Sequence, residues 1–265
     1  MPLRRIFGVL AGVGLFLSPV VLQRAEAPHA SAQTRPPTTA TDDAVTPAAP
    51  IDSLAVGRGA IEVRAPKGPL VVGPEAARLR VRSRPGGGIA TVPARNPWEQ
   101  PLVFPVIARA VDADGRQWLR ILTGVRPNGA AGWVPTDRVT TSSPGDRIAV
   151  DLSARVLRRW HEGHLVDTLD VAVGAASTPT PPGRFFVWAR LDAAATGPYG
   201  TFVLGLSGYP GDDSAAAGDA RLAIHGTDDP TDLGQAVSHG CVRVLNDQLL
   251  GLRDVAMGTL VTIRP

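Results

Sequence analysis

Two short stretches hold the residues that decide how this chain is interpreted: IHGT at residues 224–227 and SHGCVR at residues 238–243. Cys241 is the only cysteine of the 265 residues, and His225 and His239 lie within sixteen residues of it. Catalysis by a cysteine needs a base that takes the thiol proton and N–H donors for an oxyanion. A histidine on a neighbouring strand can be the base, and a glycine-containing turn can direct backbone N–H groups at one point. The pattern is therefore typical of a nucleophilic cysteine.

Two other interpretations of these residues stay open from the pattern alone. Cys241 can be a buried, inert thiol, although a position between a glycine and polar turns is unusual for one. His225, His239 and Asp229 can bind zinc, but no Glu-x-x-His motif accompanies them, so we expect no metal site. The other candidate ligands, His161 and His164, fall on a hairpin that we expect to be exposed.

The composition excludes several classes of protein. The 29 glycines and 25 prolines make up about a fifth of the chain, too many turn residues for a helical bundle. A single cysteine excludes internal disulfides and a cysteine-rich zinc site. A net charge of +3 is too small for a generic nucleic-acid binder. We therefore expect a mainly β protein with no nucleic-acid partner.

The N-terminal residues have the pattern of an export signal. Arg4 and Arg5 precede an apolar run over residues 6–22, and an A-x-A motif follows before residue 33. We expect residues 1–32 to be a signal peptide, with an uncleaved membrane anchor over residues 6–22 as the alternative. Residues 33–54 are rich in Pro, Thr and Ala and are expected to be an extended linker. The chain is thus expected in the periplasm or cell wall.

Residues 55–143 are expected to form a small β module, because short apolar runs alternate with turn residues. The stretch 118–134 resembles the end of a bacterial SH3-like module; a β spacer without a ligand is the alternative. Residues 35–138 carry fourteen basic and nine acidic side chains, a net charge of +5. We expect a weak contact between this basic module and anionic wall polymers. A solvated, arginine-rich surface is the other interpretation of the same charges.

Residues 146–265 form the second expected module, which begins after the turn-rich stretch 142–145. Its apolar runs predict mostly strands with one or two short helices. Helical periodicity appears only over residues 245–255, where Asn246 and Asp247 are candidate N-caps. The module is acidic, with a net charge of −4.

The stretch from Arg147 to Pro265 resembles the L,D-transpeptidase (YkuD-type) catalytic domain of bacterial cell-wall enzymes. The signature of this family is a histidine, a gap, and then Ser/Thr-His-Gly-Cys followed by Arg or Asn, which His225 and residues 238–243 match. Further matching stretches are PTPPGRF at 179–185, GPYG at 197–200, LGLSG at 204–208 and GTLVTI at 258–263. Pro182 departs from the Thr that many members carry, and we expect no effect on the chemistry.

The resemblance implies a role for each residue of the site. It implies Cys241 as nucleophile and His225 as general base and acid, oriented by the carbonyl of Gly226. It implies backbone N–H groups of His239, Gly240 and Cys241 as the oxyanion hole. It also implies Ser238 and Arg243 as residues that shape the loop, and Tyr199 as part of the substrate groove.

The resemblance further implies a peptidoglycan L,D-transpeptidase that makes 3→3 cross-links in cell-wall biogenesis. Its partners are then donor and acceptor stem peptides, and it needs no metal or organic cofactor. Carbapenem β-lactams are expected to acylate Cys241, and a nearby histidine is expected to lower the pKa of the thiol. Three alternatives remain: an L,D-carboxypeptidase, an enzyme that attaches other molecules to the stem, and a non-catalytic wall-binding protein.

Overall fold

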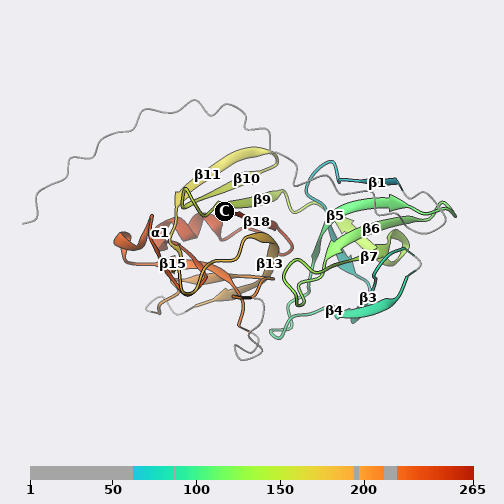
Figure 1. The fold of residues 1–265 in the computed structure, drawn as a ribbon, viewed down its shortest axis with the longest axis horizontal. Helices are drawn as coiled ribbons and strands as arrows, with labels where there is room; N and C mark the ends of the chain where they lie inside the picture. Colours follow the sequence, from blue (N-terminus) through green and yellow to red (C-terminus); the bar gives the residue numbers. More distant parts are fainter. Residues whose placement is uncertain (1–61, 86, 194–196, 212–219) are drawn as a thin grey trace, which may run out of the picture. The chain divides into compact units, whose positions relative to one another are not determined.

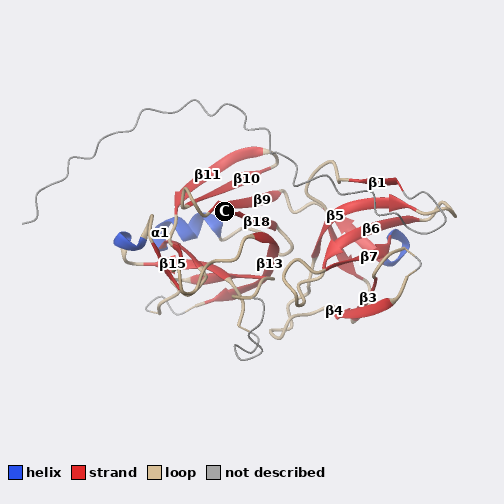
Figure 2. Ribbon diagram, viewed as in Figure 1, coloured by secondary structure: helices blue, strands red, loops and turns tan. Residues whose placement is uncertain are grey.

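The computed structural model describes residues 62–265, except for residues 86, 194–196 and 212–219. The expected signal peptide and linker, residues 1–54, lie outside the described residues. The described part is mainly β, as the sequence predicts, with two eight-stranded sheets and very little helix (Figures 1 and 2). Within it, no helix is long and apolar enough to cross a membrane.

The first sheet is built from the strands that precede residue 143. Its order is β4-β3-β7-β6-β5-β2-β8, and β1 pairs with β5 off this path. The strands predicted from apolar runs around residues 79–82 and 118–122 are present as β3 and β6. The resemblance to an SH3-like module stays a prediction. The strands are β1 (Glu62–Arg64), β2 (Val71–Pro74), β3 (Arg78–Arg82), β4 (Ile89–Pro93), β5 (Phe104–Val111), β6 (Gln117–Leu122), β7 (Ala131–Pro135) and β8 (Val139–Ser142).

The second sheet begins directly after the turn-rich stretch, at Asp146. Its order is β11-β10-β9-β18-β13-β14-β15-β17. The strands are β9 (Asp146–Asp151), β10 (Val156–His161), β11 (His164–Asp170), β13 (Gly183–Asp192), β14 (Phe202–Leu206), β15 (Ala223–Thr227), β17 (Val242–Leu245) and β18 (Leu260–Arg264). A separate parallel pair joins β12 (Val173–Gly174) to β16 (Ala236–Ser238).

Strand β13 contributes to two hydrophobic cores because successive side chains of a strand point to opposite faces. Phe185 and Val187 are buried in the core of the second sheet. Phe186 and Trp188 are buried instead in a cluster made largely of apolar residues from the first sheet. The rings of Phe186 and Phe104 meet edge to face with centroids 6.0 Å apart. The two sheets therefore share buried apolar surface at β13.

The helix predicted over residues 245–255 is shorter than expected. Helix α1 covers Asn246–Leu249, and a 3₁₀ turn follows at Leu250–Leu252. The predicted caps are wrong, because Leu245 occupies the N-cap position and makes no side-chain cap. Leu249 and Leu252 are fully buried, so packing of the apolar face holds this short helix in place.

Candidate active site

Strand pairing brings the two motif stretches together. Strands β15 and β17 are parallel neighbours in the second sheet, with His225 opposite Arg243. Cys241 directly precedes β17, so it lies one strand across from His225 and two positions along. The two residues are sixteen positions apart in the sequence, and the pairing of β15 with β17 brings them to neighbouring strands.

The turn that presents the thiol is held by its own serine. Ser238 is 1% exposed; its Oγ donates to the carbonyl of Cys241 at 2.6 Å and accepts from the N–H of Gly240 at 3.1 Å. Gly240 has a φ of +107°, a conformation that favours glycine. Ser238 is thus engaged within the turn. The Gly240 N–H already has a protein partner, so its predicted oxyanion role requires that bond to be exchanged.

A second segment, residues 174–180, braces the same turn from outside. The buried Thr180 Oγ1 donates to the carbonyl of Gly240 at 2.9 Å and accepts from the N–H of Gly174 at 2.8 Å. Thr178 Oγ1 donates to the carbonyl of Ser238 at 3.0 Å. Thr180 lies in the stretch PTPPGRF, and its contact with the turn is not predicted from the sequence. A threonine within a stretch that matches the family was the sequence feature that could have indicated this hydrogen bond.

His225 is buried and held in one orientation. Its Nδ1 lies 2.9 Å from the carbonyl of Gly226; since a carbonyl only accepts, Nδ1 carries the hydrogen and Nε2 is free to accept one. Burial is the largest cause that lowers the pKa of His225, and the charge of Arg243 adds to it. The bond to Gly226 opposes both effects. His225 is therefore neutral at pH 7, the state that a general base requires.

Tyr199 lies beside His225 at the edge of the site. The two rings meet edge to face with centroids 5.0 Å apart, and the Tyr199 carbonyl accepts from the N–H of Gly226 at 2.9 Å. Tyr199 is 51% exposed, which leaves it able to contact a ligand. Gly226 itself is crowded: a Cβ there would lie 2.0 Å from Oδ1 of Asn246.

The pKa of the Cys241 thiol is higher than expected. Burial raises its pKa above the ordinary value of 9.0, and this is the largest effect. A backbone hydrogen bond from Ala223 and the charge of Arg243 lower the pKa by less. The predicted low thiol pKa is wrong because desolvation of the thiolate outweighs these two favourable contacts. Thiol and imidazole are both neutral at rest.

Arg243 is fixed by a partner that the sequence did not reveal. Its Nη1 lies 2.8 Å from Oδ2 of Asp232, which also accepts from Thr227 Oγ1 at 3.2 Å. Asp232 belongs to the 3₁₀ turn Pro230–Asp232 between β15 and β16. The ion pair ties this connection to β17, and the predicted role of Arg243 in the 238–241 loop stays a prediction.

The remaining histidines are spread over different places. His239 is exposed in the turn, and His164 is exposed on β11. His161 Nδ1 lies 3.2 Å from Oδ1 of Asp146. Asp229, the third candidate zinc ligand, accepts from the N–H of Thr231 instead. Over the described ranges, no three His, Cys, Asp or Glu side chains are arranged to hold a metal ion.

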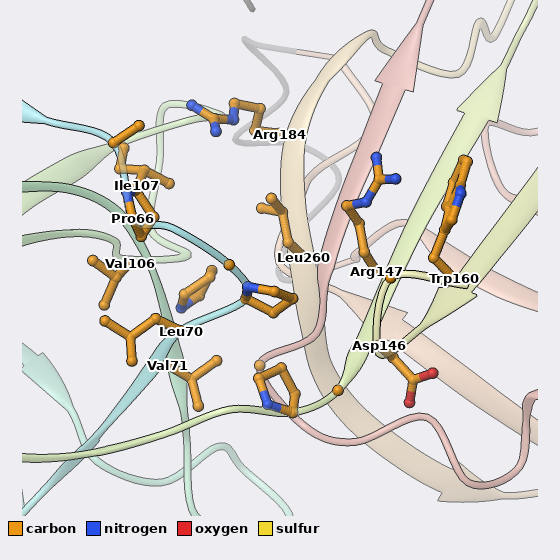
Figure 3. A pocket seen from close by; sticks show the side chains of 18 residues that line it. Pro66, Leu70, Val71, Val106, Ile107, Asp146, Arg147, Trp160, Arg184 and Leu260 are labelled. Atoms are coloured by element: carbon orange, nitrogen blue, oxygen red, sulfur yellow. The ribbon is translucent and has the colours of Figure 1, made fainter. Parts of the chain in front are cut away.

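Two cavities lie near the second sheet without containing Cys241. A cavity of about 310 Å³ is lined by residues of both sheets, among them Leu70, Arg147, Trp160 and Leu260 (Figure 3). The Arg147 guanidinium lies 3.9 Å from the centroid of the Trp160 ring. A second cavity of about 420 Å³ borders β14 and β15 and includes Ala223 in its wall. It lies directly beside the strand that bonds the thiol.

The second module matches known proteins. Residues 145–263 match the family model of the L,D-transpeptidase catalytic domain, YkuD. A Bacillus licheniformis protein named "Putative L,D-transpeptidase YkuD" is 38% identical over 120 residues, which are 45% of this chain and 66% of that protein. The Bacillus subtilis protein of the same name is 34% identical over 117 residues, 44% of this chain and 64% of that protein. The chain thus spans just under two thirds of the length of these relatives.

Solved structures of L,D-transpeptidases also match part of this chain. The NMR structure of the catalytic domain from the E. faecium L,D-transpeptidase, acylated by ertapenem, is 24% identical, with a TM-score of 0.35. That match covers 45% of this chain and 97% of that chain. An L,D-transpeptidase from Mycobacterium smegmatis is 14% identical with a TM-score of 0.36, over 57% of this chain and 91% of that one.

Proposed function

We propose that this chain is an L,D-transpeptidase of the YkuD family and makes 3→3 cross-links in peptidoglycan, because residues 145–263 match the model of that catalytic domain. The observation that carries the proposal is the placement of Cys241 one strand from His225. Nδ1 of His225 is occupied by the Gly226 carbonyl, so that Nε2 is the basic nitrogen. A cysteine with a neutral, oriented imidazole beside it is the arrangement needed for acyl transfer.

The first step is attack on a donor stem peptide. The sulfur of Cys241 bonds to the carbonyl carbon of the third stem residue while Nε2 of His225 takes the thiol proton. Because burial raises the pKa of the thiol and lowers that of the imidazole, this proton moves during the attack. The bond to the terminal D-Ala then breaks, and His225 returns the proton to the leaving amine.

The second step transfers the acyl group to an acceptor stem. The acceptor amine attacks the thioester, its C–N bond forms as the C–S bond breaks, and the proton returns to the sulfur. One amide bond forms for each one broken, so the exchange needs no energy source or redox partner. Backbone N–H groups of the 239–241 turn stabilise the oxyanion in both steps, once the Gly240 N–H leaves Ser238 Oγ.

The proposal also requires contact with the cell wall. A peptidoglycan substrate lies outside the cytoplasmic membrane, which agrees with the export signal expected over residues 1–32. The net charge of +5 over residues 35–138 supports a weak attraction of the first module to anionic wall polymers.

Intact-protein mass spectrometry of the full chain incubated with a carbapenem tests the nucleophile. Opening of the β-lactam ring loses no atoms, so acylated protein gains the full mass of the drug. We expect this adduct on the wild type and none on Cys241→Ala. Folded wild-type protein without an adduct would refute the proposal.

Turnover of a tetrapeptide stem then tests the reaction. We expect D-Ala release together with a cross-linked dimer, and Cys241→Ser is expected to abolish nearly all turnover while it leaves the fold intact. D-Ala release without a dimer would replace the transpeptidase by a carboxypeptidase. Retained cross-linking by Cys241→Ser would exclude Cys241 as the nucleophile.

A further inference from the structure

The loop that joins β6 to β7 in the first module, residues 123–130, reaches the second sheet. Gly124 has a φ of +67°, and a Cβ there would lie 3.0 Å from Cζ of Phe186 and 3.3 Å from Cβ of Ser207. The left-handed backbone and this close approach both require glycine. The loop therefore packs closely against β13 and against the residue that follows β14.

Two hydrogen-bonded anchors hold the loop at this place. The Asn128 side chain pairs with both backbone groups of Tyr209: Nδ2 donates to the carbonyl at 2.9 Å, and Oδ1 accepts from the N–H at 2.9 Å. The Gly124 carbonyl accepts from Nη1 of Arg221 at 3.0 Å. Arg221 also donates to the hydroxyl of Tyr209 at 2.7 Å. The loop thus holds Tyr209, after β14, and Arg221, just before β15.

The residues that follow these anchors touch the nucleophile turn. A Cβ at Gly240 would lie 3.5 Å from Cβ of Pro210 and 3.5 Å from Cδ2 of Leu222, so both side chains flank that glycine. The next residue, Ala223, makes the backbone hydrogen bond to the thiol of Cys241. Tyr209 therefore directly precedes one side chain that flanks Gly240, and Arg221 directly precedes the other.

We propose that the 123–130 loop is a positioning element for the reaction at Cys241. By holding Tyr209 and Arg221, Asn128 and Gly124 set the place of the Ala223 hydrogen bond and of the side chains that flank Gly240. The inference rests on the proposed function, in which Cys241 is the nucleophile. The first module then acts on the chemistry, beyond any role as a spacer.

The chain offers a matched control for this loop. Gln100, also in the first module, pairs with both backbone groups of Arg190: Nε2 donates to the carbonyl at 2.5 Å, and Oε1 accepts from the N–H at 3.1 Å. Arg190 lies on β13, two strands from β15 in the sheet order. Gln100→Ala and Asn128→Ala therefore remove the same type of contact between the modules, and only Asn128→Ala removes it beside the nucleophile.

Two measurements on the full chain report the effect of each substitution on Cys241. The first is the rate of carbapenem acylation, followed by intact mass. The second is the pH midpoint of alkylation by iodoacetamide, which reports Cys241 because the chain has no other thiol. Asn128→Ala is expected to slow acylation about tenfold, within the roughly 100-fold that a 1 Å misplacement can cost. It is also expected to raise the alkylation midpoint, because the Ala223 bond favours the thiolate.

Gln100→Ala is expected to change the acylation rate by less than about twofold and to leave the midpoint in place. Equal effects of the two variants, or a wild-type rate and midpoint in Asn128→Ala, would overturn the proposal. If Asn128→Ala does not fold, Asn128→Asp keeps the acceptor for the Tyr209 N–H and loses the donor. An intermediate rate is expected for it, and a wild-type rate and midpoint would again overturn the proposal. A wild type that is not acylated would refute the proposed function, while the alkylation midpoints would still test the positioning.

Discussion

Replacement of Thr180 by valine tests the idea that a buried hydroxyl holds the nucleophile turn. Valine keeps the shape of threonine and removes one hydroxyl, which bonds the carbonyl of Gly240 at 2.9 Å and the N–H of Gly174 at 2.8 Å. Thr180 is 3% exposed, so water cannot replace it without rearrangement. Each buried polar group left without a partner costs about 1–3 kcal/mol. The two groups together predict a loss of about 2–6 kcal/mol in the free energy of unfolding.

Thr178→Val is the matched control. Thr178 Oγ1 donates to the carbonyl of Ser238, but that carbonyl also accepts from the N–H of Ala175 at 2.9 Å and keeps this partner. The expected loss is therefore only that of one ordinary hydrogen bond, about 0.5–1.5 kcal/mol. Denaturant unfolding followed by tryptophan fluorescence measures the loss of stability in both variants. The loss is seen as a lower denaturant concentration at the unfolding midpoint, while the dependence of the free energy of unfolding on denaturant concentration is unchanged. Equal losses in the two variants would refute the reasoning that Thr180 supports both groups.

Three further outcomes are expected. Gly226→Ala places a Cβ 2.0 Å from Oδ1 of Asn246, and this overpacking should lower the free energy of unfolding by about 1–3 kcal/mol. An unchanged free energy of unfolding would contradict the close approach of Asn246 to Gly226. His225→Ala should slow carbapenem acylation at pH 7 by roughly 10²–10⁴-fold, whereas the exposed His164→Ala should change it by less than about twofold; equal effects would exclude His225 as the base. Because a protonated imidazole cannot take the thiol proton and burial lowers the pKa of His225, the acylation rate should rise with pH through a midpoint below 6.5. A midpoint above that value would contradict the buried, neutral imidazole.

Local pattern predicted much of the fold. The apolar runs and turn residues gave the strands near residues 79–82, 118–122 and 260–263 close to their observed bounds, because a strand is specified by its own alternation and by the turns beside it. The helix was overestimated at residues 245–255, where only its first turns form. A short amphipathic segment has too little propensity of its own, so packing decides its length.

Residue types and their spacing predict the candidate chemistry: one thiol, a nearby histidine, and a glycine turn in a motif that resembles that of one enzyme family. These are properties of residue type and spacing along the chain. The direction in which the pKa values of Cys241 and His225 move follows only from the folded structure, because desolvation depends on what covers a group. The same holds for hydrogen bonds between distant residues: Thr180 bonds Gly240, 60 residues away, and Asn128 bonds Tyr209, 81 residues away. Contacts over such separations form only when the sheets are assembled, and no local pattern records them.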